Sequence, residues 1–458
     1  MKRIASCALL ALLILLMIPA TPATAATTGA ASEWVGADGM YTGEYAFSLA
    51  IVGDTQTMCN MGPKGGSSMP GMYQWIVDNV ASKKIQYVLG LGDITEKGED
   101  WGHKNNDTEA ETLVGDKEWE YARNAIAKMD GVVPYSLVRG SGHDGLTRFN
   151  QWFADYTPYT DNIAGYMTEG DIGNVYHTFE ANGTKYMILC LDFGTKDPAI
   201  EWAASVIEAH PEYKVIITTH SYMEADGSLL ESGEAYCPSQ SYYDVTNNDG
   251  EELWAKLIKN HENIFMVLCG HMSTDEVVIS QVQGDHGNTV TQILIDPQAM
   301  DRNYAGGYGM VAMMYFSENG RDVAIEYYST AKDNYRALKR VDLTHVHEYT
   351  SKVIEPTCTT SGTTRYTCEG CGDSYDQGYV NRLWHSFDDK YDTTCNRCDY
   401  TRNAPKRPET ETKAPSKETE ESGGGCSSGN SSAMATPLLF GGGAAALAVN
   451  VGRKKRKK

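Results

Sequence analysis

Between residues 45 and 340, short apolar runs alternate with amphipathic segments. The apolar runs have the length and β-branched content of buried strands, and the amphipathic segments carry apolar residues three to four positions apart, as on one helix face. Strands that alternate with helices predict a largely parallel sheet with crossover helices. The strand-like runs are AFSLAIVGD, IQYVLGLGD, VVPYSLVRG, KVIITTH and IFMVLCGH, and the helix-like segments are PGMYQWIVDNVASK, DKEWEYARNAIAKM, DPAIEWAASVIEAH and GEELWAKLIKN.

Two further segments show the pattern of antiparallel hairpins. VYHTFEANGTKYMILCLDF carries Asn182-Gly183 between two apolar runs, and MVAMMYFSENGRDVAIEYY carries Asn319-Gly320 in the same setting. Asn-Gly is a strong hairpin signal because both residues tolerate a positive φ angle. We therefore expect an α/β fold in which antiparallel pairs join the parallel strands, giving two mixed sheets packed between helices.

Acidic and histidine side chains directly follow five of the strand-like runs. In open α/β sheets, the edge beyond the carboxyl ends of the strands is where ligands bind. Taken singly, an Asp after a strand is often a turn or cap residue, and a lone His is often structural. The repetition at five strand ends indicates a shared site instead. These residues are Asp54, Asp93, His143 with Asp144, His220 and His271.

The order of these motifs resembles that of the calcineurin-like metallophosphoesterases. The signature of that family runs D-x-H, G-D, G-N-H-D, a His after a strand, and G-H-x-H. The resemblance covers about residues 45–340 and implies a four-layer α/β/β/α sandwich that holds two metal ions. The corresponding stretches are Asp54-Thr55-Gln56, Gly92-Asp93, Ser141-Gly142-His143-Asp144, His220 and Gly270-His271-Met272-Ser273.

The resemblance also implies roles for these residues. Asp93 would bridge two divalent ions about 3.5 to 4 Å apart, and a metal-bound hydroxide would attack phosphorus. His143, oriented by Asp144, would stabilise the phosphoryl oxygens or protonate the leaving group. The expected activity is hydrolysis of phosphomonoesters or phosphodiesters, with a small phosphate ester as substrate. The implied metal ligands are Asp54, Gln56, Asp93, His220 and His271.

Three positions depart from the family pattern. Gln56 replaces a His, Gly142 stands where an Asn belongs, and Ser273 replaces the last His. Ser141, in a shifted loop, and Asp275 are candidate replacements for the missing ligands. The oxygen-rich donor set shifts the expected pair of ions from Zn towards Mn, Mg, Ca or Fe. The alternative function is a catalytically weak, metallophosphoesterase-like binding module at the cell surface.

Residues 345–402 form a Cys- and His-rich segment with two C-x-x-C pairs. One interpretation is a structural zinc bound by four thiolates. A second interpretation divides the ligands into two groups, and a third is that the cysteines form disulfides, as is common outside the cell. The four thiolates are Cys368, Cys371, Cys395 and Cys398. The two alternative groups are His347 with Cys358, Cys368 and Cys371, and His385 with Cys395 and Cys398.

The N-terminal segment has the features of a secretory signal. Residues 1–25 contain two basic residues, an apolar stretch and an A-x-A pattern at Ala23-Thr24-Ala25. Residues 26–44 are then a lead-in to the folded domain at 45–340. The alternative is an uncleaved membrane anchor.

The C-terminal segments predict attachment at the cell surface. Residues 403–431 are rich in Pro, Thr, Lys and Glu, which is typical of an extended spacer. Residues 432–458 are small and apolar and end in RKKRKK, as in an anchor or sorting segment with a cytoplasmic basic flank. The alternative for this end is a disordered tail. We expect a secreted protein held at the membrane or cell wall through its C-terminus.

The charge balance limits the partners of the chain. It has 60 Asp and Glu against 39 Lys and Arg, a formal net charge of −21. This excess of negative charge argues against a general nucleic-acid binder, whose surface must neutralise phosphates. A phosphate-bearing substrate would need a local cation.

Overall fold

The computed structural model describes residues 41–62, 68–98, 114–241, 246–302, 307–345, 349–369 and 374–408. The chain forms two compact units, Met1–Trp384 and His385–Lys458. The predicted signal peptide, most of the lead-in, the spacer beyond residue 408 and the C-terminal anchor lie outside the described residues. None of the described helices has the length and apolar content that a membrane crossing requires.

The first of two large sheets has six strands in the order β13-β12-β11-β1-β2-β3. Its β1, β2 and β3 are parallel, and β11, β12 and β13 add antiparallel strands beside β1. The sheet is therefore mixed, as the sequence predicts. The strands are β1 (Phe47–Val52), β2 (Ile85–Gly90), β3 (Tyr135–Leu137), β11 (Met310–Phe316), β12 (Asp322–Ser329) and β13 (Asn334–Asp342).

The second large sheet has seven strands in the order β4-β5-β6-β7-β8-β10-β9. Its central strands β6, β7, β8 and β10 are parallel, and the strands at both edges are antiparallel. The strands are β4 (Ile163–Thr168), β5 (Asp171–Ala181), β6 (Thr184–Leu191), β7 (Lys214–Thr219), β8 (Ile264–Cys269), β9 (Val278–Gln283) and β10 (Thr289–Leu294).

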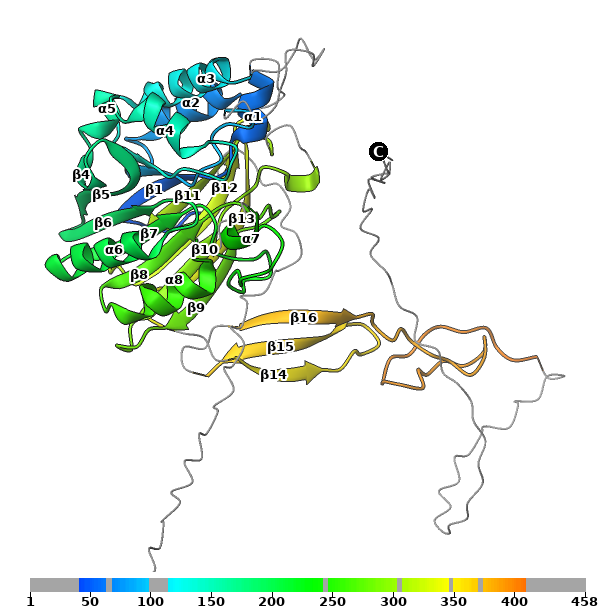
Figure 1. The fold of residues 1–458 in the computed structure, drawn as a ribbon. Coiled ribbons are helices and arrows are strands. Elements are labelled where there is room, and N and C mark those ends of the chain that lie inside the picture. Colours follow the sequence, from blue (N-terminus) through cyan, green and yellow to red (C-terminus); the bar gives the residue numbers. More distant parts are fainter. Residues whose placement is uncertain are drawn as a thin grey trace, which may run out of the picture. The chain divides into compact units, whose positions relative to one another are not determined.

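Helices cover the outer face of each sheet, so that the order of layers is α/β/β/α (Figure 1). The helices α2 and α3 lie over the first sheet, and α6 and α8 lie over the second. This arrangement confirms the predicted four-layer sandwich. The helices are α1 (Gln56–Met61), α2 (Met69–Asn79), α3 (Asp116–Ile126), α4 (Leu146–Phe153), α5 (Thr157–Thr160), α6 (Asp197–Ala209), α7 (Pro238–Ser241) and α8 (Gly250–Lys256), with short 3₁₀ turns at Ala127–Met129, Ile258–Asn260 and Met300–Arg302.

The residues of β6 show why the layers form. Ile188 and Cys190 belong to the apolar cluster that the two sheets share, whereas Leu189 and Leu191 pack with α6 residues such as Ala203 in a second cluster. Successive side chains of a strand point to opposite faces, so an unbroken apolar run predicts burial on both sides. The second sheet therefore needs cover from the first sheet on one face and from helices on the other.

Both predicted hairpins are confirmed. Strands β5 and β6 pair in antiparallel register around Asn182-Gly183, where both residues are left-handed with φ of 49° and 71°. Strands β11 and β12 also pair antiparallel, but of Asn319-Gly320 only Gly320 has a positive φ, at 70°. The side chain of Asn319 instead accepts the backbone N–H of Arg321, which closes the turn differently.

The Cys- and His-rich segment contains a small third sheet. Its strands β14 (Tyr349–Ile354), β15 (Gly362–Cys368) and β16 (Ser374–Val380) are antiparallel. The boundary between the two compact units, after Trp384, falls inside the segment 345–402 that the sequence predicts as one module.

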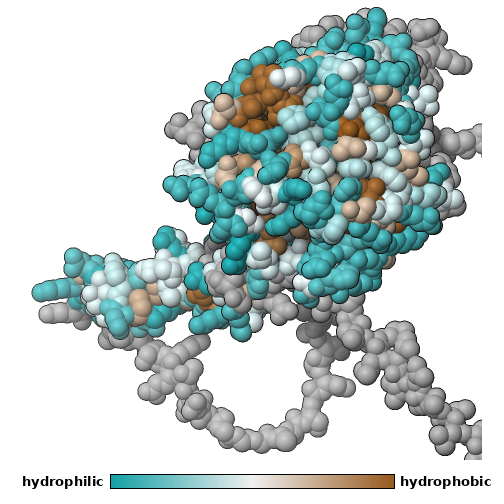
Figure 2. Space-filling view, turned by 90° about the vertical axis from the view of Figure 1, so that its left-hand side faces the viewer, coloured by the Kyte–Doolittle hydropathy of each residue, from teal (hydrophilic) through white to brown (hydrophobic). Residues whose placement is uncertain are grey.

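The face of the protein drawn in Figure 2 is predominantly hydrophilic, with apolar side chains gathered in a few separate patches. This distribution is expected when the apolar runs form buried strands and most polar side chains face the solvent. Several carboxylates are nevertheless buried, among them those of Asp54, Asp93, Asp144 and Asp296.

We predict that His177, on β5, limits stability in acid. Its Nδ1 is 2.9 Å from the Asn162 carbonyl, and its Nε2 is buried with no hydrogen-bond partner among the described residues. Burial lowers the pKa of His177 to about 4. The unfolded chain therefore binds the proton first, and about 3 kcal/mol of stability is lost as the pH falls from 6.5 to 4.

His177→Phe removes this titration, so the variant should lose less stability than the wild type over that interval in urea unfolding. The exposed His286 offers a matched control, since His286→Gln should leave the pH profile unchanged. Parallel pH profiles for wild type and His177→Phe would contradict the assignment.

Candidate metal centre

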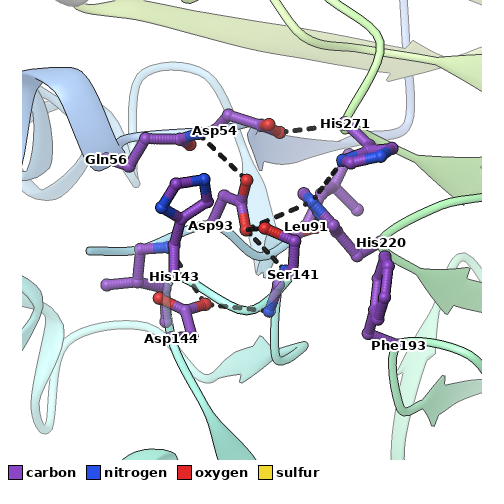
Figure 3. A network of polar contacts seen from close by, with 12 residues as sticks. Asp54, Gln56, Leu91, Asp93, Ser141, His143, Asp144, Phe193, His220 and His271 are labelled. Atoms are coloured by element: carbon purple, nitrogen blue, oxygen red, sulfur yellow. Dashed lines mark hydrogen bonds and ion pairs between the residues drawn. The ribbon is translucent and has the colours of Figure 1, made fainter. Parts of the chain in front are cut away.

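The polar residues that follow the strands converge at one place (Figure 3). Asp54 follows β1, Asp93 follows β2, and His143 lies in the loop after β3. His220 follows β7 and His271 follows β8, in the second sheet. The site therefore lies where the carboxyl ends of parallel strands from both sheets meet, which is where such folds bind ligands.

Asp93, His220 and His271 form the centre of this group. One donor atom from each lies within 4.8 Å of the other two. The Nε2 atom of His220 is 3.3 Å from Asp93 Oδ1 and 3.2 Å from His271 Nδ1. One carboxylate and two imidazoles at this spacing are a donor set that can hold a divalent metal ion.

Backbone carbonyls fix the orientation of both imidazoles. The Nδ1 atom of His220 is 2.8 Å from the Leu91 carbonyl, and His271 Nε2 is 2.9 Å from the Tyr236 carbonyl. A carbonyl only accepts, so each of these ring nitrogens carries the proton. The opposite nitrogens then face each other as two lone pairs, which repel unless a proton or a cation lies between them. Histidines that bind metals typically have one ring nitrogen held by a carbonyl or carboxylate in this way.

The short distances among Asp93, His220 and His271 shift the pKa values of all three residues. Burial alone would lower the pKa of His220, but the charges of Asp93 and Asp54 outweigh it and raise the pKa to about 10. Burial and the neighbouring His220 lower the pKa of His271 to about 4. Burial would raise the pKa of Asp93, yet the charge of His220 and its hydrogen bond lower it. The negative field therefore retains one positive charge between the two rings.

Asp54 and Gln56 lie on the other side of Asp93. The Gln56 side chain donates from Nε2 to Asp93 Oδ2 at 3.0 Å, and its buried Oε1 has no hydrogen-bond partner among the described residues. Asp54 Oδ1 accepts the backbone N–H of His271 at 3.2 Å. Burial and the neighbouring Asp296 raise the pKa of Asp54 well above its ordinary value.

Two of these residues have a strained backbone. Asp93 and His271 are left-handed, with φ angles of 44° and 74°. Non-glycine residues rarely adopt this conformation unless the surrounding structure enforces it, and such residues cluster at functional sites. Gly140 permits the close approach of the β3 loop, since a Cβ there would lie 2.0 Å from the backbone nitrogen of Asp93.

The positions that depart from the family pattern have identifiable neighbours. Ser141 donates to Asp93 Oδ1 from both its backbone N–H and its hydroxyl, at 2.5 and 2.7 Å, so its side chain lies in the site beside the substituted Gly142. The carboxylate of the exposed Asp275 instead accepts the backbone N–H of Asp301 at 2.8 Å. The hydroxyl of Ser273 lies 3.3 Å from the Asp296 carbonyl.

His143 is oriented differently from the expectation. Its Nδ1 is 2.8 Å from the Glu96 carbonyl, so this backbone group, and not Asp144, fixes the ring. The buried Asp144 carboxylate instead accepts the backbone N–H groups of Ile94, Thr95 and Gly140. The predicted role of Asp144 in orienting His143 is therefore corrected: Asp144 joins the loop after β2 to the loop after β3.

Several residues at the site were not predicted. Tyr236 contributes the carbonyl that holds His271, and Gln298 donates to the carboxylates of Asp54 and Asp296. Asp296 is fully buried and follows β10. Asp296 carries the same sequence signal as the predicted residues, an acid directly after the apolar run TVTQILI. Tyr236 acts through its main chain and leaves no such signal.

A second group of donors lies in the C-terminal unit. The Sγ atom of Cys398 is 3.4 Å from His385 Nδ1, and Cys395 contributes a thiol within 4.8 Å of both. Burial would raise the pKa of Cys395, but N–H donors such as that of Arg397 lower it to about 6. Of the predicted zinc ligands, Cys371 and His347 lie outside the described residues, and Cys368 is 3.1 Å from His345 Nε2.

Comparison with known proteins gives no function. No family model matches the chain. The uncharacterized protein YvnB of Bacillus subtilis (strain 168) is 26% identical over 267 residues, which are 56% of this chain and 18% of that protein. The chain thus spans less than a fifth of the length of this relative. A solved structure, GAP50, the anchor in the inner membrane complex of Plasmodium, is 12% identical with a TM-score of 0.37, over 66% of this chain and 90% of that one.

The role of Asp144 leads to a stability prediction. Asp144→Asn puts an NH₂ group among three backbone donors, and the unfavourable contacts should lower the free energy of unfolding by about 2 to 4 kcal/mol. His143 contacts the site but its side chain is 40% exposed, so His143→Gln should change stability by less than about 1 kcal/mol. Urea unfolding of the metal-free proteins measures both. Equal effects would contradict the distinction between Asp144, which anchors two loops, and His143, which is partly exposed at the site.

Proposed function

We propose that the chain is a metal-dependent phosphoesterase of the calcineurin-like kind, which hydrolyses phosphomonoesters or phosphodiesters. The observation that supports it best is the pair of imidazoles, His220 and His271: backbone carbonyls hold one nitrogen of each ring, which leaves the opposite nitrogens beside Asp93. The ordered motifs at the strand ends support the same family. An acidic protein otherwise repels phosphate esters, so a cation centre is what such a substrate requires.

The residues present fit two divalent ions. Asp93, His220 and His271 would hold one ion, and Asp54 and Gln56 would hold the other, with Asp93 shared between them. Such ions act as Lewis acids that polarise a phosphoryl oxygen and supply a nucleophile from water. The buried Oε1 of Gln56, which has no partner among the described residues, is a ready oxygen ligand for this centre.

His143 is the residue best suited to proton transfer. Burial lowers its pKa, but the charge of Asp93 and the hydrogen bond to the Glu96 carbonyl outweigh this and raise it above the ordinary value. These groups therefore favour the protonated ring, in which Nδ1 donates to the Glu96 carbonyl and Nε2 carries the second proton. In this role His143 donates that proton to an oxygen of the substrate, at the phosphoryl group or the leaving group.

We further propose a structural zinc in the C-terminal unit, bound by His385, Cys395 and Cys398. The low pKa of the Cys395 thiol supports it, because the thiolate is the form that binds metal. A segment this small has little apolar core, so a metal ion that links its ligands would add to its stability.

The proposed place of action is outside the cell. The signal-like residues 1–25 support export, and the basic end of residues 432–458 supports retention at the membrane or wall. In this arrangement the spacer carries the folded units away from the surface to which the C-terminus is attached.

The activity is tested with aryl phosphate mono- and diesters in the presence of Mn, Mg, Ca, Fe or Zn. Wild type should turn over at least one of them. Asp93→Asn should lose both metal binding and turnover, whereas His143→Gln should keep metal binding and lower kcat by about 10²- to 10⁴-fold. The exposed Asp275 gives the control Asp275→Asn, which should be fully active. Metal binding without turnover of any ester would favour the binding-module alternative.

Zinc analysis separates the two cysteine groupings. Cys395→Ser should release one zinc per chain, because it removes a ligand of the proposed three-residue group. Cys368→Ser should retain that zinc, since Cys368 belongs to the four-thiolate grouping and not to this one. Loss of all zinc in Cys368→Ser would favour the four-thiolate grouping, loss of one of two zinc ions would indicate a separate group that contains Cys368, and a wild type without zinc would contradict every grouping.

A further inference from the structure

The ligand-like groups beside Asp93 continue beyond the residues that the family motifs specify. Asp296 is 0% exposed and Asp54 is 5% exposed. The Nε2 atom of Gln298 lies between them, 3.3 Å from an oxygen of each carboxylate. Two buried carboxylates thus share one partly positive nitrogen. A cation bound by both carboxylates would lie in the same region, between them.

These carboxylates are short of positive charge. Among the described residues, no lysine or arginine forms an ion pair with Asp54, Asp93 or Asp296, and the charged partner of Asp93 is His220, with the rings of His143 and His271 nearby. Burying three carboxylates near one another is costly unless protons or cations neutralise them. The cluster is therefore electrostatically incomplete.

An independent observation identifies what is missing. Gln56 is 7% exposed, and its Oε1 has no hydrogen-bond partner among the described residues although its carboxamide points to Asp93 (Figure 3). A buried amide oxygen that receives no hydrogen bond is energetically unfavourable. A cation beside Asp93 would give this oxygen its partner, either directly or after the carboxamide flips.

The backbone places Asp296 where the family's last histidine is absent. The hydroxyl of Ser273, which stands at that position, lies 3.3 Å from the Asp296 carbonyl, and Thr274 donates its backbone N–H to the same carbonyl at 2.8 Å. The Ile295 N–H is bonded to the Cys269 carbonyl, which ties the end of β10 to the loop of His271. Asp296 therefore reaches the site from the neighbouring strand end.

We propose that Asp296 and the Oε1 of Gln56, together with Asp54 and the shared Asp93, form an all-oxygen cation site beside the His220 and His271 site. This inference rests on the metal centre of the proposed function and deepens it. Carboxylate and amide oxygens select hard ions such as Mn²⁺, Mg²⁺ and Ca²⁺, whereas the imidazole site also accepts softer ions. The two halves of the centre thus differ in their metal preference.

The test uses Mn²⁺ with the full chain after removal of metals by a chelator. Equilibrium dialysis should give two Mn²⁺ per chain for the wild type, and paramagnetic resonance should show a spin-coupled pair. Asp296→Asn should bind one Mn²⁺ and show the six-line signal of an isolated ion. The neighbouring Asp275 carboxylate provides the matched control, since Asp275→Asn should keep both ions and the coupling.

Gln56→Met is a second variant that removes the unpartnered oxygen and keeps the shape of the side chain. This variant should lower the affinity for the second Mn²⁺ by about 10-fold or more. A coupled pair that survives in both Asp296→Asn and Gln56→Met would overturn the proposal, as would a wild type that binds a single ion.

Turnover measured on the same samples separates this inference from the proposed function. A coupled Mn²⁺ pair without hydrolysis of any ester refutes the phosphoesterase and leaves the oxygen site intact. Hydrolysis that is unchanged in an Asp296→Asn variant with a full pair refutes the oxygen site and leaves the phosphoesterase intact.

Discussion

The close approach of the two sheets at their carboxyl edges is the constraint on which the site depends. At Gly53, after β1, a Cβ atom would lie 2.6 Å from the carbonyl of Ile295 at the end of β10. The loop after β3 meets Asp93 at Gly140 with as little room. Only glycine fits such contacts, because it has no side chain. Strand ends from both sheets can therefore deliver polar groups to one small volume.

The same packing removes water from those polar groups. The interior between the sheets is apolar and continuous, and Asp54, Asp93 and His220 are buried beside it. In a medium of low polarity, charge interactions are strong and an uncompensated charge is costly. The shifted pKa values, the strained backbone at Asp93 and the Oε1 of Gln56, which has no hydrogen-bond partner in the described part of the chain, are local results of this one arrangement.

The sequence predicts the layers and most of the site because both depend on short-range patterns. Apolar runs define β1, β2, β7 and β8, and the polar residue that follows each run lies at the site. The edge strands β4 and β9 carry no comparable run, since they are only half buried. The partners of the site histidines could not be predicted, because Leu91, Glu96 and Tyr236 act through main-chain carbonyls that every residue has.

That reliance on the main chain has an evolutionary consequence. All three imidazoles at the site, those of His143, His220 and His271, are held by backbone carbonyls. A substitution that keeps the local backbone leaves these carbonyls in place. The side chains around the histidines can therefore change while the rings keep their orientation. The direction in which each ring points is thus insensitive to the identity of the residue that supplies its carbonyl.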